Sequence, residues 1–395
     1  MALRWKIADG SAGGSGGEAA GGGRGEGPGG PGGPGGGGEG VLFDADRLVS
    51  RHFGSGAFEG MEFLHVNARR IINEVPATSR MPFRYTINVY RGCSHACTYC
   101  FARPTHEYLG MDTGEDFERR IVVKVNAVEL LRAELVARRW GGHHIAMGTN
   151  TDPYQRCEGK YHLTQGVVRV LSEAGNPFSI LTKSTLVLRD KALLAEASQR
   201  TDVRVNLSIG TLDEEVWRLT EPGTPPPRAR VAAVRKLNEA GISCGVLVAP
   251  IIPGLSDRPE QLEEVVQACV DAGAASISSV SLHLRPGVRE HFMGWLAEAR
   301  PELVEEFKRR YRRSYLPEAE LKSVSERVAE VATRSGLSGG QWRLQVGEDV
   351  ASSRVEGGGA APAEQLGLPL GLGATARGNG EGQRRGATAR GNGEG

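Results

Sequence analysis

The sequence predicts an α/β fold with a parallel sheet, and two observations lead to this prediction. Between residues 83 and 300, short apolar runs rich in β-branched residues alternate with longer segments of helical periodicity, which is typical of six successive βα units. Outside that region, residues 10–40 and 356–395 are mostly Gly with Ala, Ser, Pro and Glu. Such segments have almost no apolar surface to bury, so we expect disordered Gly-rich tails at both ends.

These changes in composition divide the chain. The folded unit has a length of roughly 300 residues, which suits a single α/β barrel. The C-terminal tail contains an exact duplication, GATARGNGEG, at 373–382 and 386–395. The predicted divisions are a tail at 1–41, an N-terminal extension at 42–82, the barrel at 83–300, a helical closure at 301–346 and a second tail at 347–395.

The six expected strands are apolar runs between turn residues. In a parallel sheet, residues that carry chemistry gather where the strands end. The expected strands are 85–90, 144–149, 178–182, 203–209, 243–249 and 275–282. A short additional strand is expected at 342–346.

The helices between these strands are expected from caps and terminators. Asn126 and Thr164 are expected N-caps, and Gly175 and Gly241 are expected to end two helices. The expected helices are 127–138, 164–174, 190–197, 227–240 and 257–272, with 68–73 in the extension and 302–315 and 318–335 in the closure.

Charge and cysteine usage exclude several classes of protein. Lys and Arg number 48 against 47 Asp and Glu, so the net charge of +1 gives no global attraction to nucleic acid. The six cysteines do not form a disulfide framework pattern, and the first residues lack the apolar core of a signal peptide. No apolar run approaches membrane-spanning length. We expect a cytoplasmic protein without membrane contact.

Three cysteines lie close together after the first expected strand. Cys93, Cys97 and Cys100 have the spacing C-x3-C-x2-C, with Tyr99 directly before the third. Three thiolates on one short loop suit an iron–sulfur cluster, and three ligands for four irons leave one iron open to a substrate or cofactor. The alternatives are a structural zinc site, with His95 as a fourth ligand, and unreactive buried thiols.

Further motifs follow the strand ends. Together with the cysteine loop, they resemble the radical S-adenosylmethionine (SAM) superfamily, in the subgroup of spore photoproduct lyase and of proteins often labelled DNA repair photolyase. Within that subgroup, the chain is most similar to uncharacterised actinobacterial proteins. The motifs are Arg-Gly-Cys at 91–93, ARPTHE at 102–107, GTNTDPYQ at 148–155, LTKS at 181–184, LTEPGT at 219–224 and APIIPG at 249–254.

This resemblance covers about residues 75–315 and implies a fold, cofactors and a reaction. The implied fold is a partial (β/α)6 barrel of the TIM type. The implied cofactors are a [4Fe–4S] cluster, held by the three cysteines, and SAM. The implied reaction is reductive cleavage of SAM to a 5′-deoxyadenosyl radical, with a reductant of the flavodoxin or ferredoxin type as partner.

Polar residues at two strand ends are candidate SAM contacts. Asn150, Thr151 and Asp152 offer amide, hydroxyl and carboxylate oxygens suited to the ammonium group of SAM. An ordinary strand-exit turn at Asp152 is the alternative. Lys183 and Ser184 offer a cation and a hydroxyl suited to the carboxylate or ribose of SAM, and a solvated surface lysine is the alternative.

Apolar and sulfur-containing residues complete the candidate site. Ala249 and Pro250 are expected to form an apolar wall for adenine, and Tyr99 is expected to cover the cluster or stack near the adenine. Cys157 follows the second strand and is a candidate catalytic hydrogen donor, because lyases of the resembling family use a cysteine thiol in this way. A spare loop thiol is the alternative reading of Cys157.

Three functions remain open at this stage. The first is a radical SAM enzyme that acts on damaged or modified nucleic acid, for which the run 308–315, KRRYRRSY, offers cations and interleaved tyrosines. The second is a radical SAM enzyme that acts on a peptide or small metabolite, and the third is a redox sensor without turnover. The tail segment 365–370, QLGLPL, resembles the sliding-clamp-binding motif except at Pro369, so a sliding clamp is a candidate partner.

Overall fold

The computed structural model describes residues 8–9, 48–76, 79 and 81–337. The duplicated decamer, the clamp-like segment 365–370 and the expected strand 342–346 all lie outside the described residues.

A seven-stranded sheet forms the centre of the molecule. Six of its strands run parallel in chain order, which confirms the expected α/β fold of a partial TIM-type barrel, and β4 adds one antiparallel strand beside β5. The order is β12-β11-β10-β9-β8-β5-β4, with β4 (Ile72–Glu74), β5 (Tyr85–Ile87), β8 (Ile145–Met147), β9 (Phe178–Thr182), β10 (Val203–Ser208), β11 (Ser243–Ile251) and β12 (Ile277–Ser281).

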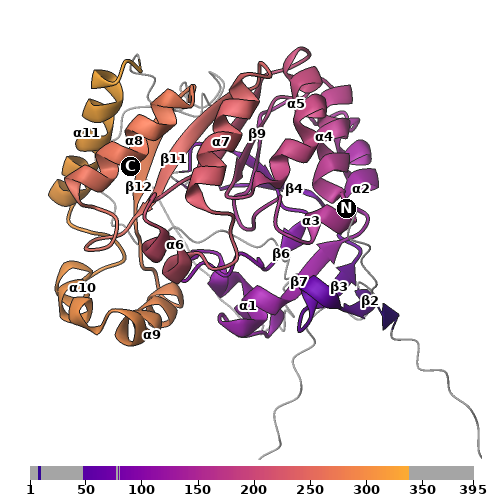
Figure 1. Ribbon diagram of the computed structural model, residues 1–395. Coiled ribbons are helices and arrows are strands. Elements are labelled where there is room, and N and C mark those ends of the chain that lie inside the picture. Colours follow the sequence, from indigo (N-terminus) through magenta and orange to yellow (C-terminus); the bar gives the residue numbers. More distant parts are fainter. Residues whose placement is uncertain (1–7, 10–47, 77–78, 80, 338–395) are drawn as a thin grey trace, which may run out of the picture.

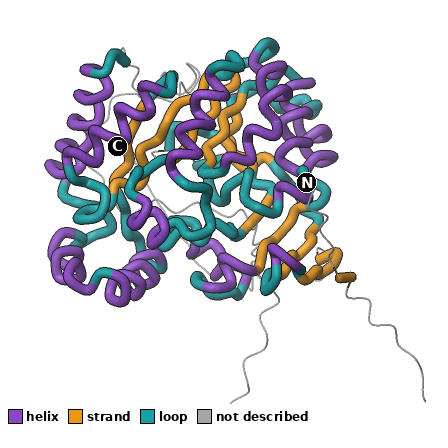
Figure 2. The backbone as a smooth tube through the Cα atoms, in the orientation of Figure 1, coloured by secondary structure: helices purple, strands orange, loops and turns teal. Residues whose placement is uncertain are grey.

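Helices lie around the outside of this sheet (Figure 1). The tube view in Figure 2 shows the same arrangement, with the strands of the sheet inside the helices. They cover the strands because their apolar stripes face inward, as Val234 and Leu237 of α7 do. The covering helices are α2 (Ala127–Leu135), α4 (Leu163–Glu173), α5 (Lys191–Ser198), α7 (Pro227–Asn238), α8 (Pro259–Asp271) and α11 (Glu318–Arg334).

Further helices and turns lie in the connections between these elements. Helix α9 was not predicted, and α10 is shorter than the expected helix over 302–315 because the chain leaves helical geometry at Tyr311. These elements are α1 (Glu115–Arg119), α3 (Glu158–Tyr161), α6 (Glu214–Thr220), α9 (Val288–Ala299), α10 (Val304–Arg310) and the 3-10 turns η1 (Gly56–Phe58), η2 (Arg103–Leu109), η3 (Thr185–Asp190) and η4 (Pro301–Leu303).

The N-terminal extension forms part of a second sheet. Its order is β1-β2-β3-β7-β6, and β3 runs parallel to β7. These strands are β1 (Ala8–Asp9), β2 (Leu48–Phe53), β3 (Glu62–Val66), β6 (Tyr90–Arg91) and β7 (Arg120–Lys124). The extension is therefore joined by hydrogen bonds to a strand that comes after the cysteine loop.

The expected helix at 68–73 is wrong, because side chains of a distant helix satisfy its backbone. Both carboxylate oxygens of Glu134 accept hydrogen bonds at 2.9 Å, from the N–H groups of Ile71 and Ile72. The amide of Asn126 bonds the N–H and C=O of Ala68, so Asn126 occupies the N-cap position of α2 without capping it. Extended backbone at β4 follows from these contacts.

Two other capping expectations are resolved by the structure. Thr164 does not cap α4, which begins at Leu163; its hydroxyl donates instead to the carbonyl of Pro153 at 2.6 Å. Gly175 and Gly241 do follow helices, with φ of 61° and 76°, in the left-handed region that glycine adopts at helix ends.

No helix within the described part of the chain is both long and apolar enough to cross a membrane.

Candidate functional site

The cysteine loop begins with a turn that requires glycine. Gly92 has φ of 78°, and a Cβ there would lie 2.8 Å from the carbonyl oxygen of Phe117. Cys93 and Cys97 are buried and Cys100 is half-buried, and all three are free thiols. The loop is therefore packed into the protein and not displayed on its surface.

The segment after β8 holds the start of this loop. The side-chain amide of Gln155 accepts from the N–H of Ser94 and donates to the carbonyl of Gly92, both at 3.0 Å. The hydroxyl of Thr151 donates to the same carbonyl at 2.6 Å. Thr151, an expected SAM contact, thus positions the cysteine loop, and Gln155 is a positioning residue that the sequence analysis missed.

Asp152 also faces the cysteine loop. Its Oδ2 lies 3.3 Å from Nδ1 of His95, the residue that stands between the first two cysteines in the sequence. The same oxygen accepts a hydrogen bond from the N–H of Lys183 at 2.7 Å. Its Oδ1 accepts from the hydroxyl of Thr182 at 2.6 Å. Burial raises the pKa of this carboxyl. The charge of His95 and these hydrogen bonds lower the pKa by more than burial raises it, so the net pKa is below its usual value. Asp152 is therefore an anion held by protein groups.

A cluster of charged side chains also contacts the loop, through Tyr99. Glu221 accepts from Nζ of Lys183 at 3.0 Å, from Nη2 of Arg230 at 2.5 Å and from the phenol of Tyr99. Nζ of Lys183 also donates to the carbonyl of Ala249 at 3.1 Å and lies 5.6 Å from the centre of the Tyr99 ring. Lys183 is thus an interior cation, contrary to the surface alternative.

The electrostatic state of Glu221 follows from its neighbours. Burial raises the pKa of the carboxyl, but the positive charges of Arg230 and Lys183 outweigh it and lower the pKa to about 2. Glu221 is therefore ionised at neutral pH and compensates the buried Arg230 and the half-buried Lys183. From the sequence, Glu221 in the LTEPGT motif is expected to be a turn or capping residue, with a functional role implied by the family resemblance alone, and Arg230 lies in none of the motifs.

The end of the cysteine loop is held by Arg103. Its guanidinium is fully buried and donates to the carbonyl of Cys97 through Nε at 3.1 Å and Nη2 at 2.9 Å. It also pairs with Glu118 and lies over the ring of Phe117. Arg103 therefore positions the backbone between the second and third cysteines.

The residues of the loop fit an iron–sulfur cluster. Within the described ranges, no three His, Cys, Asp or Glu side chains lie close enough together to hold one metal ion, and His95 is engaged by Asp152, so a zinc site with His95 is not supported. A cubane differs, because each thiolate binds a different iron. Burial raises the pKa of Cys93, and the nearby charge of Asp152 and the thiols of Cys100 and Cys97 raise it further. The three thiols are free on one short loop, so they are available as ligands of such a cluster.

Asn150 presents a buried oxygen to the same region. Its Oδ1 has no hydrogen-bond partner among the described residues, while its backbone N–H donates to Oδ1 of Asn88 at 3.1 Å. A buried amide oxygen without a partner costs free energy unless a ligand satisfies it. Asn150 is therefore the predicted SAM contact whose side chain the described protein leaves available.

The other predicted contacts have protein partners. Ser184 accepts from the N–H of Leu186 at 3.2 Å and so caps η3. The carbonyl of Ala249 accepts from Ser208 as well as from Lys183, and Ala249 joins Pro250 through a cis peptide bond. Their roles toward SAM remain predictions.

Cys157 lies apart from the three motif cysteines. Its side chain has no exposed surface and belongs to the main hydrophobic core, together with Tyr90. Burial, followed by the neighbouring charge of Glu158, raises the pKa of its thiol. This placement matches the spare-thiol alternative and gives no support to Cys157 as a catalytic residue.

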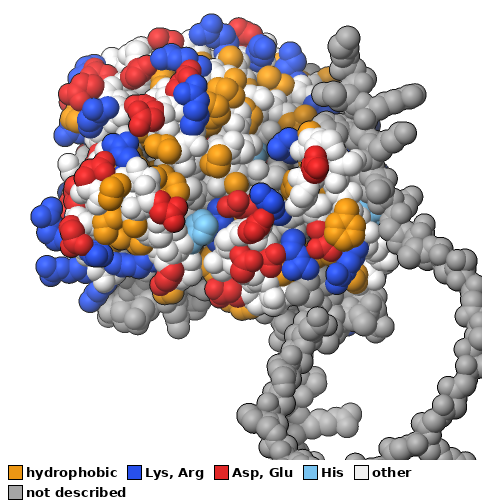
Figure 3. All heavy atoms as spheres, turned by 60° about the horizontal axis from the view of Figure 1, so that its bottom comes forward, with side chains coloured by type: hydrophobic (Ala, Val, Ile, Leu, Met, Phe, Trp, Pro, Cys, Tyr) orange, Lys and Arg blue, Asp and Glu red, His pale blue; other side chains and the backbone are white. Residues whose placement is uncertain are grey.

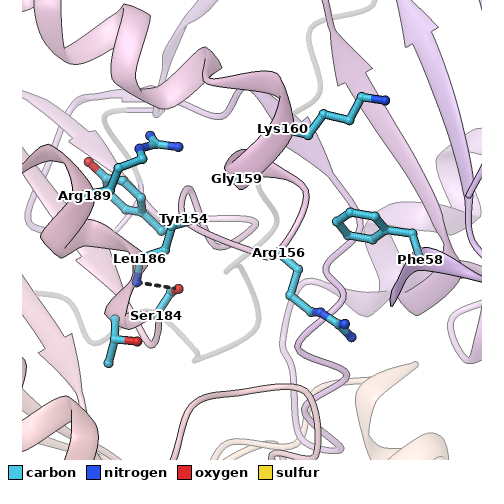
Figure 4. Close-up of a pocket in the computed structure, with 9 residues that line it drawn as sticks. Phe58, Tyr154, Arg156, Gly159, Lys160, Ser184, Leu186 and Arg189 are labelled. Carbon is cyan, nitrogen blue, oxygen red and sulfur yellow. Dashed lines mark hydrogen bonds between the residues drawn. The ribbon is translucent and has the colours of Figure 1, made fainter. Parts of the chain in front are cut away.

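A separate pocket lies between the segments that follow β8 and β9 (Figure 4). Its volume is about 510 Å³, and none of the three motif cysteines lines it. Arg189, on its wall, is bound to Glu158 and Asp190. The lining residues are Phe58, Tyr154, Arg156, Gly159, Lys160, Ser184, Thr185, Leu186 and Arg189.

The basic run at 308–315 differs from the expected base-stacking surface. Tyr311 is fully buried and donates from its hydroxyl to the carbonyl of Leu282 at 2.9 Å, so it cannot stack on a base. Arg310 pairs with Glu306 and Glu320. The exposed cations of this run are Arg309, Arg312 and Arg313, with Lys308 exposed as well but paired with Glu305.

Comparison with known proteins identifies the family. The model of the radical SAM superfamily matches residues 87–269. An uncharacterized protein of Mycobacterium tuberculosis is 47% identical over 283 residues, which cover 71% of this chain and 83% of the relative. An uncharacterized protein of Acidianus two-tailed virus is 31% identical over 208 residues, which cover 51% of this chain and 68% of the relative.

Solved structures support the same conclusion at the level of the fold. One variant of spore photoproduct lyase has a TM-score of 0.50 and 18% identity, with coverage of 70% of this chain and 80% of its own. A second variant has a TM-score of 0.50 and 19% identity, with coverage of 69% and 78%. From its family model, its relatives and its three-cysteine loop, the chain belongs to the radical SAM superfamily.

Proposed function

We propose that this radical SAM enzyme acts on damaged or modified nucleic acid, as a lyase related to the DNA repair photolyase-like proteins. The observation that carries the proposal is the fold shared with spore photoproduct lyase over about 70% of the chain. The sequence motifs that resemble the same subgroup support it independently.

Family membership sets the cofactors, a [4Fe–4S] cluster and SAM. When bound and reduced, they supply a 5′-deoxyadenosyl radical. Cys93, Cys97 and Cys100 would hold the cluster. Burial of Cys93 and Cys97 keeps water away from the site, which protects a reactive radical from side reactions. Enzymes of this family need a reductant, and we propose one of the flavodoxin or ferredoxin type.

The residues around the loop would position the cofactors. Lys183 lies within 5.6 Å of the Tyr99 ring and is held by Glu221, so its positive charge is fixed beside the cysteine loop. A fixed cation there offsets the negative charge that three thiolates bring. The buried oxygen of Asn150 would accept from the ammonium group of SAM.

Surface charge is compatible with a nucleic-acid substrate. Figure 3 shows acidic and basic side chains intermixed over the face at the bottom of Figure 1, with Lys and Arg gathered at the edge where α10 lies. Arg309, Arg312 and Arg313 are exposed there. Local cations of this kind contact phosphates even where the net charge is close to zero.

The test is turnover by anaerobically prepared, cluster-loaded protein. With dithionite and SAM, ultraviolet-irradiated DNA should be converted to repaired nucleosides, detected by mass spectrometry after digestion, and 5′-deoxyadenosine should form. Undamaged DNA is the matched control. Release of 5′-deoxyadenosine without any change in the DNA would reject nucleic acid in favour of another substrate, and no release with any reductant would indicate a sensor.

A further inference from the structure

Three aromatic rings form a row that begins beside the last motif cysteine. Phe101 directly follows Cys100, and its ring centroid lies 6.0 Å from that of His283. His283 stacks on Tyr315 with centroids 5.5 Å apart and an interplanar angle of 18°. These three residues are called the aromatic row below. All three are partly exposed.

The row is assembled from segments far apart in the chain and is held by a fixed frame. Phe101 lies in the cysteine loop, His283 lies between β12 and α9, and Tyr315 follows α10. The backbone N–H of Leu284 donates to the carbonyl of Ser314 at 2.7 Å, and the buried Tyr311 joins the same two segments through Leu282. The rings are therefore positioned before any ligand arrives, which reduces the entropy cost of binding.

Positive charge accompanies the row. The guanidinium of Arg285 lies 5.8 Å from the centre of the Phe101 ring and donates to the carbonyl of the same residue. Arg312 and Arg313 are exposed on the segment that leads into Tyr315. The nearby carboxylate of Glu290 accepts from the N–H of Gly287 at 2.5 Å, so it caps α9.

The middle ring of the row is uncharged at neutral pH. Burial lowers the pKa of His283 to about 4, and the positive charge of Arg285 contributes to the same shift. A neutral imidazole adds no charge of its own, so the row consists of flat uncharged rings, while the arginines provide the cations. Proteins that bind single-stranded nucleic acids combine flat aromatic rings, on which the bases stack, with cations that contact the phosphates.

We propose that the aromatic row binds unpaired nucleobases of a single-stranded or locally opened nucleic acid, with Arg285, Arg312 and Arg313 on its phosphates, and so leads the strand to the cysteine loop. This inference rests on the proposed function and adds the path by which the substrate reaches Cys100. It also accounts for an aromatic residue directly after the third cysteine.

The test measures binding, separately from turnover. The probe is a fluorescein-labelled 12-nucleotide oligodeoxythymidine, titrated with the full chain and followed by anisotropy. His283→Ala and Tyr315→Ala should each raise Kd by roughly five- to a hundredfold, as expected for one stacked base. Tyr315→Phe, which keeps the ring, should bind like the wild type.

The chain offers a matched control for the stacked pair. His143 stacks on Tyr85 with ring centroids 5.1 Å apart and an interplanar angle of 25°. His143 precedes β8, so it lies at the other end of that strand from the segment that contacts the cysteine loop. His143→Ala should leave Kd unchanged. The double variant Arg312→Ala and Arg313→Ala should reduce the slope of log Kd against log salt by about 1.4.

The outcomes separate this inference from the proposed function. If the wild type binds the probe and both His283→Ala and Tyr315→Ala leave Kd unchanged, the proposed role of the aromatic row is rejected. The proposed repair reaction is then still supported if irradiated DNA is converted. Absence of any wild-type binding would overturn the row as well. Ring-dependent binding without conversion of irradiated DNA would support the row and reject the proposed repair reaction.

Discussion

The phenol of Tyr99 donates a hydrogen bond to Oε1 of Glu221, 122 residues further along the chain. This bond ties the cysteine loop to the segment after α6. The same carboxylate binds Lys183 after β9 and Arg230 on α7. One buried anion thus joins four segments, and the position of the loop depends on its charge.

Replacing that anion should destabilise the fold. Glu221→Gln keeps the shape but leaves the buried Arg230 and the half-buried Lys183 without their anionic partner, which should cost about 3–5 kcal/mol in the free energy of unfolding. Urea denaturation of the cluster-free protein measures this cost. Glu305→Gln, on an exposed pair with Lys308, is the control and should change it by less than about 1 kcal/mol. Equal effects of the two variants would contradict a central role for Glu221.

The same carboxylate predicts the acid limit of stability. Folding lowers the pKa of Glu221 from its usual 4.5 to about 2. A depressed pKa means that its stabilisation is complete above pH 4.5 and is lost as the pH falls toward 2. The loss amounts to about 3 kcal/mol. Glu221→Gln should flatten this part of the stability profile, and an unchanged acid limb in the variant would show that other groups control it.

The pairing of Asp152 with His95 should be measurable as a coupling. Asp152→Asn, His95→Gln and the double variant form a cycle, and contact across 3.3 Å in a buried site predicts an interaction energy of about 0.5–3 kcal/mol. The exposed pair Arg132 and Glu173 provides a control cycle with a coupling below about 1 kcal/mol. Additive effects at Asp152 and His95 would mean that this contact does not position the cysteine loop.

The three motif cysteines should each be essential for the cluster. Cys93→Ala, Cys97→Ala or Cys100→Ala leaves two protein thiolates, so iron and sulfide content should fall to background. Cys244→Ala and Cys269→Ala remove fully buried core thiols and should retain the cluster. A normal iron content in any motif variant would refute the assignment.

The parts of the fold that could be predicted from the sequence are those determined locally. Six strands were found because their β-branched runs are separated by helices with clear ends, such as those before Gly175 and Gly241. Strand β7 was missed although it carries an Ile-Val-Val run, and it pairs with β3, more than fifty residues earlier, outside the regular alternation of strands and helices. The false helix at 68–73 arose because the contacts of Glu134 and Asn126 are equally distant in the chain.

The site shows the same limit. The cysteines were predicted because their spacing is itself the signal, whereas Gln155 bonds the backbone carbonyl of Gly92, 63 residues away, and the N–H of Ser94. Arg230 did leave a trace in the sequence. It shares a face of α7 with Val234 and Leu237, both fully buried, and a charged residue on an apolar face indicates a buried ion pair.

Cys157 should be dispensable for SAM cleavage. Because its side chain is packed in the core, Cys157→Ala should lower the free energy of unfolding by about 1–2 kcal/mol. Formation of 5′-deoxyadenosine by the reduced, cluster-loaded variant should match the wild type. Continued SAM cleavage with loss of substrate product would instead make Cys157 the hydrogen donor.

Asn150 should affect stability and SAM affinity in different ways. Its buried Oδ1 lacks a partner among the described residues, so Asn150→Ala removes an oxygen that contributes no hydrogen bond to the ligand-free fold. Chemical denaturation of the cluster-free variant should show an unfolding free energy equal to or above that of the wild type.

SAM binding should weaken in the same variant. Loss of a hydrogen bond to the ammonium group costs about 1.5–3 kcal/mol, or roughly a ten- to a hundredfold rise in Kd. Anaerobic calorimetry on cluster-loaded protein measures it, with Asn238→Ala as a control, because the amide of that asparagine bonds the backbone of Val234 in α7 and of Cys244 in β11. Reduced stability of the variant with unchanged SAM affinity would mean that Asn150 has a structural role. Replacing an asparagine that supports the fold lowers the unfolding free energy, whereas replacing one that contacts only the ligand does not.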